Sequence, residues 1–534
     1  MRLFLGFCVS TIAALATPTV TAVLNNYSNL VPGAPNYAIA PGSLFVIYGT
    51  GMAAAGAQAQ LWNLSQGPLP LSAPDSNGTS ITVVVNGVTV HPGIYYYTAN
   101  QVAAVLPSNT PVGNGAITVT YNGQTSPAAG IQVVASALGL DTTYGIGAGQ
   151  GVATDNVTGN LITFTASAKW DEVVVLWGSG VGADTANDDR TYPARQDQLS
   201  YLSALYIGGV SAKILYQGRS QYPGVDQIDV IIPEGVSGCY VGITAVSGSG
   251  SSAVVSNTVS MPIAQNGGEC SDPTLGVTGS SLISWSRMSS VSYANLNIAQ
   301  ESVQQNGVAL YSGVSGNGIF EQVQSGRYGS GLGGVSLGSC MVSTGATGAM
   351  GPFPNYTGLD AGAITVSGGS PSPLMLGASA STPGFYSANF APGFTLMGGT
   401  SFQVSNGSGG KNVGGFNVKV TVPNSPFTWI NMSSIQTVTR AQGITINWTG
   451  GDPSTYVAIT GSSSNSSATA SFTCYVPQTA LTFTVPPYIT LALPAGSGDL
   501  FVYNSTAPVS FTAVGINTGQ ATITEGNVIS PSYN

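Results

Sequence analysis

The chain has 534 residues, of which 6% are charged, and its formal net charge is −9. An average globular protein carries about 25% charged residues, so the surface here must consist mainly of Ser, Thr, Asn, Gln and Gly. Eleven basic residues are too few to neutralise a phosphate backbone over several contacts, which excludes nucleic acid as a partner. The 43% hydrophobic content, arranged in periodic runs, excludes a disordered chain.

The N-terminal segment has the pattern of a secretory signal peptide. Arg2 precedes an apolar run that ends at Leu15, and small residues stand at Val20 and Ala22. We predict a signal peptide over residues 1–22, cleaved after Ala22. The apolar run is too short to span a bilayer, and no later stretch has about 18 unbroken apolar residues. We therefore expect a protein that is secreted or associated with the cell surface and has no membrane span.

Strand patterns dominate the rest of the sequence. In AITVTYN the residues Ile117, Val119 and Tyr121 share one face, with threonines on the other, as in a half-buried strand. Asn-Gly, Gly-Gly and Pro-Gly pairs separate such runs and supply the positive φ values of tight turns. Many short strands with these breaks predict an all-β fold made of β-sandwiches.

An internal repeat divides the first half of the chain. Four blocks recur in the same order and with similar spacing: LFVIYGTGM (44–52) with VVVLWGSGV (173–181), VVVNGV (83–88) with LYIGGV (205–210), NQVAAVLP (100–107) with DQIDVIIP (226–233), and GAITVTYNG (115–123) with YVGITAVSG (240–248). We predict two copies of one domain, over residues 23–140 and 141–264.

The order of these blocks resembles the immunoglobulin-like fold of plexins and transcription factors. The tandem arrangement is more closely similar to an uncharacterised domain family at the C-termini of secreted acidobacterial proteins. The matching residues run from about Ser43 to Pro262, and here a further segment follows them. The resemblance implies two immunoglobulin-like β-sandwiches and an exported location, and it brings no catalytic residues.

A larger domain is expected over residues 272–534, after a linker at 264–272 (AQNGGECSD). Residues 272–360 are rich in Gly and Ser, and clear strands such as FNVKVTV, GITINW and ASFTCYV follow from Gly362. We predict one larger β-sandwich here, for which a jelly roll is one arrangement.

Four cysteines remain once Cys8 leaves with the signal peptide, namely Cys239, Cys270, Cys340 and Cys474. In an exported protein four thiols indicate two disulfides, with three possible connectivities. We favour Cys239–Cys270 and Cys340–Cys474, because the first two bracket the end of one domain and the others lie in the last. A metal site is the weaker alternative, since no pair has CxxC spacing.

The one histidine of the sequence, His91, is the only candidate for a catalytic base near neutrality. No G-x-S-x-G motif accompanies it, it directly precedes the turn signal Pro92-Gly93, and the second copy has Lys213 in the same region. We interpret His91 as a turn residue and predict no catalytic residues.

The densest acidic stretch, GADTANDDRT, contains Asp184, Asp188 and Asp189. Carboxylate oxygens in a loop could hold calcium, although the spacing is not that of an EF-hand. The alternative is a solvated loop, and no other cofactor is expected.

Aromatic residues are the second candidate for a binding site, because exposed rings hold sugars on many exported sandwiches. Tyr95, Tyr96 and Tyr97 form a run in which strand alternation would put Tyr95 and Tyr97 on one face and Tyr96 on the other. Trp429 and Trp448 also lie in or near strands, and Trp448 is expected in the core.

These features favour a non-enzymatic structural or adhesive protein of the cell surface or matrix, with an extracellular glycan or protein as partner. A carbohydrate-binding module protein is the alternative. A glycosidase comes third, because no local pattern identifies its pair of carboxylates.

Overall fold

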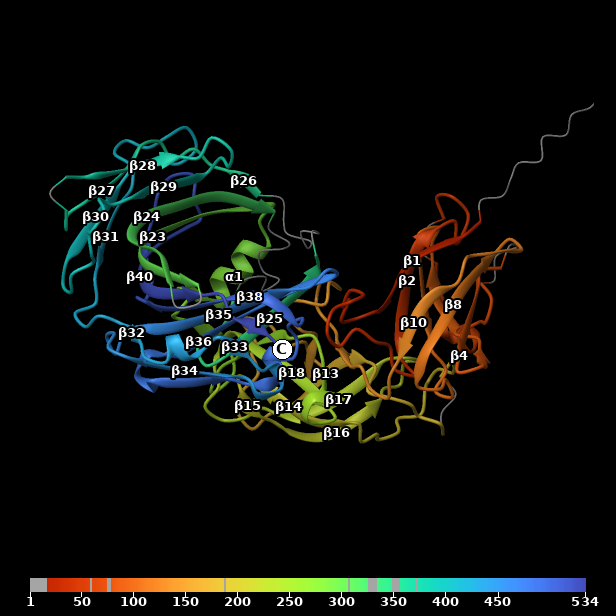
Figure 1. Cartoon of the computed structure of the whole chain (residues 1–534). Helices are drawn as coiled ribbons and strands as arrows, with labels where there is room; N and C mark the ends of the chain where they lie inside the picture. Colours follow the sequence, from red (N-terminus) through yellow and green to blue (C-terminus); the bar gives the residue numbers. More distant parts are fainter. Residues whose placement is uncertain are drawn as a thin grey trace, which may run out of the picture.

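A computed structural model describes residues 17–57, 60–73, 78–186, 189–305, 308–324, 334–347, 356–370 and 372–534. The protein is all-β, as predicted, and has three parts in chain order (Figure 1). The first domain lies on the right of that view, the second at the lower centre, and the larger C-terminal region on the left.

The first domain is a sandwich of two sheets, with strand orders β1-β2-β7-β6-β3 and β10-β8-β4-β5, where β9 adds to β8. Its core contains Phe45, Ile81, Val102 and Ile117, all fully buried. The strands are β1 (Thr19–Asn25), β2 (Leu44–Thr50), β3 (Gln60–Leu61), β4 (Ser80–Val85), β5 (Val88–Val90), β6 (Gly93–Tyr97), β7 (Gln101–Val105), β8 (Gly113–Tyr121), β9 (Gln124–Thr125) and β10 (Ala129–Val133).

The second domain repeats this topology. Its sheets have the orders β11-β13-β17-β16, with β12 on β13, and β15-β14-β18-β19, with β20 on β18. The strands are β11 (Gly139–Leu140), β12 (Ala153–Asp155), β13 (Val173–Ser179), β14 (Leu202–Ile207), β15 (Val210–Ser211), β16 (Lys213–Arg219), β17 (Asp226–Ile231), β18 (Gly238–Ser247), β19 (Val254–Val255) and β20 (Val259–Ile263). Because β11 pairs with β13, this domain begins slightly before the predicted boundary at residue 140.

The four repeated blocks occupy equivalent strands in the two domains. β2-β7-β6 corresponds to β13-β17-β16, and β8-β4-β5 to β18-β14-β15. The hairpin turns also correspond, because Asn86-Gly87 and Gly208-Gly209 all have positive φ. Both copies bury the same alternate positions: Val102, Ala104 and Leu106 in the first, and Ile228, Val230 and Ile232 in the second.

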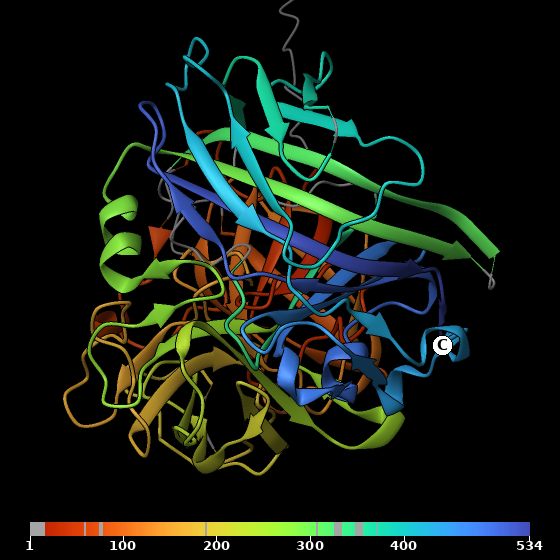
Figure 2. The same cartoon turned by 90° about the vertical axis from the view of Figure 1, so that its left-hand side faces the viewer.

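One long sheet organises the C-terminal region, in the order β25-β36-β35-β38-β40-β23-β24-β29-β28-β27-β30-β31. Its centre is the hairpin of β23 and β24, beside which β40 runs parallel to β23 (Figure 2). The strands are β21 (Ser271–Asp272), β22 (Val277–Thr278), β23 (Ser290–Gln305), β24 (Val308–Gln324), β25 (Cys340–Ala346), β26 (Tyr356–Gly358), β27 (Ile364–Ser367), β28 (Leu374–Ala378), β29 (Phe385–Asn389), β30 (Ser401–Ser405), β31 (Asn417–Thr421), β32 (Thr428–Trp429), β33 (Thr437–Val438), β34 (Ile444–Thr449), β35 (Tyr456–Ser464), β36 (Ala468–Pro477), β37 (Thr482–Val485), β38 (Gly496–Ser505), β39 (Val509–Phe511), β40 (Thr518–Ile529) and β41 (Ser532–Tyr533), with helices α1 (Gly279–Ser286) and α3 (Pro487–Thr490).

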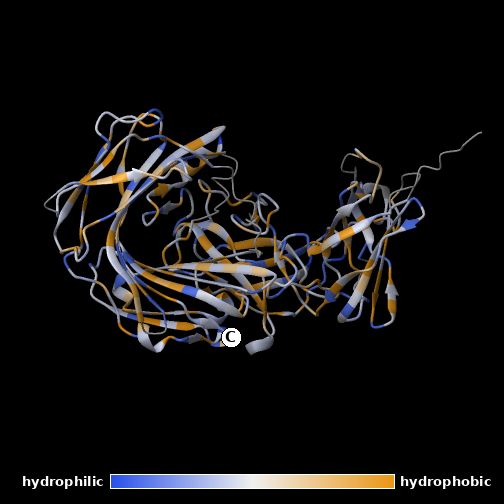
Figure 3. Cartoon of the chain, turned by 45° about the horizontal axis from the view of Figure 1, so that its top comes forward, coloured by the Kyte–Doolittle hydropathy of each residue, from blue (hydrophilic) through white to orange (hydrophobic). Residues whose placement is uncertain are grey.

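Two cores form on this sheet where we expected one sandwich. At one end β27, β30 and β31 fold over β23 and β40, so that Phe402 and Val420 pack with Leu296. At the other end the small sheet β32-β34-β37 covers β35 and β38, and both Trp429 and Trp448 are buried in this second core. Hydrophobic and hydrophilic residues alternate along many of these strands, as half-buried sheets require (Figure 3).

Both disulfides that we favoured are present in the structure. Cys340 lies opposite Cys474 in the β25–β36 ladder, and Cys239 of β18 joins Cys270. The predicted linker is therefore not a free tether, because Cys270 is bonded within the end of the second domain. Backbone bonds from Cys270 to Phe164 and from Gly279 to Cys270 hold it on both sides.

The start of β1 bears on the predicted signal peptide. Residues 1–16 lie outside the described residues, but β1 begins at Thr19 and pairs with β2 along its length. The predicted cleavage after Ala22 thus falls inside this strand. In addition to the backbone ladder, the Thr19 and Thr50 hydroxyls lie 2.8 Å apart.

Candidate functional site

The first and second domains meet in a closely hydrogen-bonded joint. Leu44 N at the start of β2 donates to Ser179 Oγ (2.7 Å), and that hydroxyl donates to Gly224 O (2.6 Å). The Asn25 side chain donates to Ala137 O (3.1 Å) and Ser179 O (2.9 Å). Because these groups are buried, they fix the angle between the domains more strongly than a flexible linker would.

A buried ion pair stands at the centre of this joint. The Arg219 side chain is 2% exposed and contacts Asp226, which is fully buried. Asp226 also accepts from Gly180 N (2.6 Å) and Val181 N (2.7 Å), and Arg219 Nη2 donates to Gly182 O (2.6 Å). Burial lowers the pKa of Arg219, but Asp226 and Asp189 more than offset this and hold it above its usual value. The guanidinium therefore stays charged.

Two of the three acidic residues of the predicted calcium loop lie beside this ion pair. Asp189 accepts from both Ser108 N (2.6 Å) and Ser108 Oγ (2.7 Å), and Asp184 N donates to the same hydroxyl (3.0 Å). Burial raises the pKa of the Asp189 carboxyl, and the bonds from Ser108 offset part of that rise. The loop thus docks the second domain onto the first.

Calcium binding at this loop stays a prediction. Asp188 lies outside the described residues. Within the described ranges, no group of three His, Cys, Asp or Glu side chains is placed to hold a metal ion. Arg219 already supplies a positive charge to Asp184 and Asp189.

A pocket of about 330 Å³ opens beside this loop. The first domain contributes His91, Val105, Pro107, Ser108 and Asn109, and the second contributes Thr185, Asp189 and Arg190. His91 is exposed, and its Nδ1 lies 3.4 Å from Ile81 O. His91 and Pro92 form the short connection by which the chain passes from β5 in one sheet to β6 in the other, and Gly93 already belongs to β6, so the predicted turn at Pro92-Gly93 is not formed. The histidine instead lines this pocket.

The tyrosine run corrects one sequence inference. A β-bulge between Ile94 and Tyr96 shifts the register of β6 against β7. Tyr95 and Tyr96 consequently both pack on the outer face of the sheet, whereas Tyr97 lies in the core with 7% exposure. Strict alternation would have put Tyr95 with Tyr97, and it fails because the bulge adds one residue to the strand.

Tyr95 and Tyr96 belong to an aromatic cluster on this outer face. With Tyr27, Trp62 and Leu64 they pack against Leu44, Leu69, Ala103 and Val105. Burial raises the pKa of Tyr95, with smaller contributions from Tyr222 and Tyr192, whose rings stack at 5.5 Å. Burial, followed by Tyr48, raises the pKa of Tyr96 to about 12. All members of the cluster belong to the first domain, and its rings are only partly covered.

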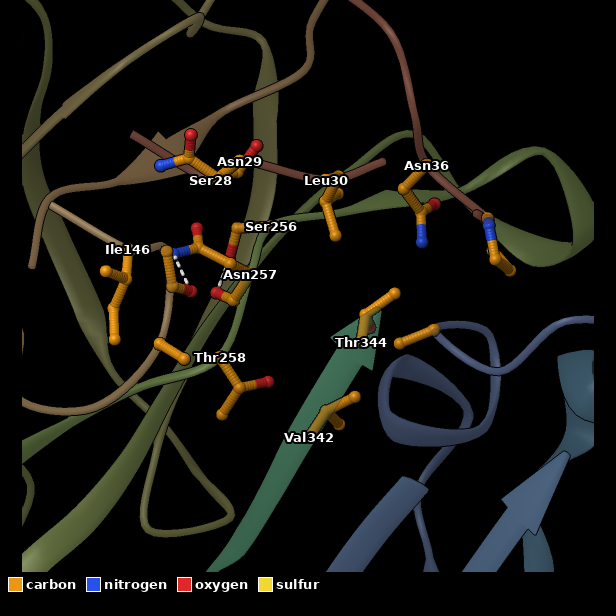
Figure 4. Close-up of a pocket in the computed structure, with 14 residues that line it drawn as sticks. Ser28, Asn29, Leu30, Asn36, Ile146, Ser256, Asn257, Thr258, Val342 and Thr344 are labelled. Atoms are coloured by element: carbon orange, nitrogen blue, oxygen red, sulfur yellow. Dashed lines mark hydrogen bonds between the residues drawn. The ribbon is translucent and has the colours of Figure 1, made fainter. Parts of the chain in front are cut away.

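A second cavity lies where all three parts of the chain meet (Figure 4). Leu30 and Asn36 of the first domain face Asn257 of the second and Thr344 of β25. Asn257 Nδ2 donates to Gly147 O at 2.9 Å. The cavity volume of about 50 Å³ holds a few waters and is too small for an organic ligand.

The second domain also packs tightly on the C-terminal region. Asp272 accepts from Cys239 N (3.1 Å) and from Ser336 Oγ (2.5 Å). The rings of Tyr206 and Tyr488 stack with centroids 4.2 Å apart. Val246 and Val255 of the second domain extend the core of the C-terminal region. This joint is therefore partly a shared hydrophobic core.

Sequence reasoning missed Arg219 and Asp226. One signal was present, because Asp226 opens the block DQIDVIIP where the first copy has Asn100. Asn100 is exposed, whereas Asp226 is completely buried. The change from the Asn100 amide in the first copy to the Asp226 carboxylate in the second therefore indicated that this position has different surroundings in the two domains.

No family model matches the chain, and no curated protein matches it. Among solved structures it is similar to titin domains A168-A170, at 9% identity over 76% of this chain and 99% of that chain, with a TM-score of 0.14. Domains 4-9 of surface layer protein SbsC give 12% identity over 95% and 66%, with a TM-score of 0.12. Dimeric latent PorU from Porphyromonas gingivalis gives 10% over 76% and 35%, with a TM-score of 0.15. Scores this low carry no argument about function.

The fold itself shows two β-sandwiches of one repeated topology followed by further β-structure. Within the described ranges, every helix is too short or too polar to cross a membrane.

Proposed function

We propose that this chain is an exported, non-enzymatic protein that acts as a structural or adhesive element at the cell surface or in the matrix. The observation that carries the proposal is the construction of the two joints. The first is closed by hydrogen bonds between the domains, such as Leu44 N to Ser179 Oγ and Ser108 to Asp189, and the second by a shared core. A protein that bears load or presents a surface needs such fixed orientations, because flexible linkers would let its parts move independently.

Other features support export. The N-terminal apolar segment has signal-peptide character, and two disulfides suit an oxidising compartment. The tandem repeat resembles the domain family of secreted acidobacterial proteins, and we propose a relationship with it.

The test is cell fractionation combined with small-angle scattering. Antibody detection of the protein in the medium or on intact cells is expected, and the purified protein should scatter as one rigid particle at low and high salt. Retention in the cytoplasm would contradict export, and a salt-dependent increase in particle length would contradict a rigid structural role.

Carbohydrate binding is the second candidate function, favoured by the aromatic cluster around Tyr95 and Tyr96. Partly covered aromatic rings stack on the C–H faces of sugars. A glycan and matrix-polymer array with the whole chain tests this function, with Tyr96→Ala as the variant. Saturable binding that Tyr96→Ala weakens supports it, whereas equal binding by both proteins contradicts a role for the cluster.

A further inference from the structure

The pocket between the two immunoglobulin-like domains has the size and place of a ligand site. Its volume of about 330 Å³ falls at the lower end of the roughly 300–1,000 Å³ found for small-molecule pockets. Such sites occur preferentially between domains, where two surfaces supply different groups. In this pocket the first domain supplies His91 and Asn109, and the second supplies Thr185 and Asp189.

The lining combines a polar rim with an apolar wall. Asn109, Thr185 and Asp189 offer amide, hydroxyl and carboxylate groups, which together donate and accept hydrogen bonds. Pro107 contributes apolar surface beside them. A pyranose ring has the matching character, because its hydroxyls project from the rim while its C–H groups form an apolar face.

The charges at the pocket disfavour other ligand classes. An anion would meet the Asp189 carboxylate, and the guanidinium of Arg190 already donates to Leu69 O (3.2 Å). A cation would be repelled by the positive charge of Arg219. This guanidinium lies close enough to Asp189 for the carboxylate to raise the pKa of Arg219. A purely apolar ligand would leave the rim groups without partners. A neutral polyhydroxylated ligand meets none of these costs.

The acceptor groups are held in place before any ligand arrives. Each Asp189 oxygen accepts one bond from Ser108, a residue that is 5% exposed, and a carboxylate oxygen can accept a second. Fixed acceptors of this kind reduce the entropy lost on binding.

We propose that this pocket binds one neutral pyranose unit of a glycan. The proposal rests on carbohydrate binding, the second function above, and gives it a site that adjoins the aromatic cluster through Val105.

The experiment titrates the intact exported protein with the methyl glycosides of glucose, galactose, mannose and N-acetylglucosamine, followed by saturation-transfer NMR and calorimetry. At least one glycoside is expected to bind. Asn109→Ala and Thr185→Val should each weaken it by about 3- to 10-fold, the value of one lost hydrogen bond. Asn114→Ala is the matched control, since Asn114 is an exposed amide on β8 of the opposite sheet, and it should leave binding unchanged.

Two outcomes would contradict the pocket as the sugar-binding site and still leave carbohydrate binding by the protein supported. One is array binding to a polysaccharide with no binding of any methyl glycoside. The other is glycoside binding that Tyr96→Ala abolishes while both pocket variants bind normally. Glycoside binding that depends on Asn109, with no polymer bound on the array, would instead support the pocket and contradict the aromatic cluster as a polymer site.

Discussion

Replacing Arg219 by alanine is the sharpest test of the joint between the first two domains. The guanidinium is 2% exposed and is the cationic partner of the fully buried Asp226. It also lies against Gly42 of the first domain, where a Cβ atom would fall 1.6 Å from Nη2. Arg219→Ala would therefore leave a buried carboxylate without its counter-charge and a gap at the domain contact.

The expected cost follows from the burial of the pair. Removing one partner of a buried ion pair destabilises proteins by about 3–5 kcal/mol, because the remaining charge is uncompensated. Asp226 keeps its bonds from Gly180 N and Val181 N, so we expect the lower part of that range, about 3 kcal/mol. For domains of this size the midpoint of thermal unfolding should fall by about 10 °C.

Calorimetry of the intact protein measures this change, and Arg195→Ala provides the matched control. Arg195 is paired with Asp197 at 2.7 Å, but its side chain is 68% exposed. Exposed pairs contribute about 0–1 kcal/mol, so the control should change the midpoint little. The double variant Arg219→Met with Asp226→Asn should recover part of the loss, because it removes both charges. If Arg219→Ala unfolds at the same temperature as Arg195→Ala, the reasoning is wrong.

Three further predictions follow from the same structure. Gly42→Ala should loosen the joint, seen as increased particle length in small-angle scattering, because φ is +78° and the new methyl group would strike Arg219; an unchanged scattering profile would contradict this. Burial raises the pKa of the Asp141 carboxyl to about 6, so the folded protein holds the carboxyl proton more tightly than the unfolded chain does. The stability that the protonated carboxyl contributes is therefore lost as the pH rises through 6. Asp141→Asn should therefore stabilise the protein above pH 6 by about 2 kcal/mol in urea titrations and have no effect near pH 3, whereas equal effects at both pH values would refute the assignment. Finally, an intact β1 requires cleavage before Thr19, and Ala16 ends an A-x-A sequence that suits a signal peptidase. Mass spectrometry of the exported protein should therefore find Thr17 at the N-terminus rather than the residue after Ala22.

The repeat, its buried positions and the disulfides were predictable because they depend on local patterns. Alternation along AITVTYN placed Ile117 and Val119 on one face, and both are fully buried in the core, since a strand has only two faces. The pairing of Cys340 with Cys474 followed from domain membership.

The remaining features depend on contacts between distant segments. The bulge beside Tyr96 arises from pairing with β7, and a one-residue shift moves a side chain to the other face. The parallel pairing of β23 with β40 joins Tyr293 to Thr518, and no pattern in either strand specifies that neighbour. Arg219 looks in sequence like any surface arginine, because its burial comes from docking of the first domain.

Comparison of the two copies separates framework from function within this one chain. Positions that fold the sandwich carry equivalent apolar residues in both copies, so Leu106 and Ile232 are both completely buried. Positions that form the joint differ, as where exposed Asn100 corresponds to buried Asp226. A difference at such a position is not needed for the fold, because the other copy folds without it. The residues of the joint are thus the ones that distinguish this protein from a plain tandem repeat. Substitutions there should alter domain orientation or ligand binding before they prevent folding.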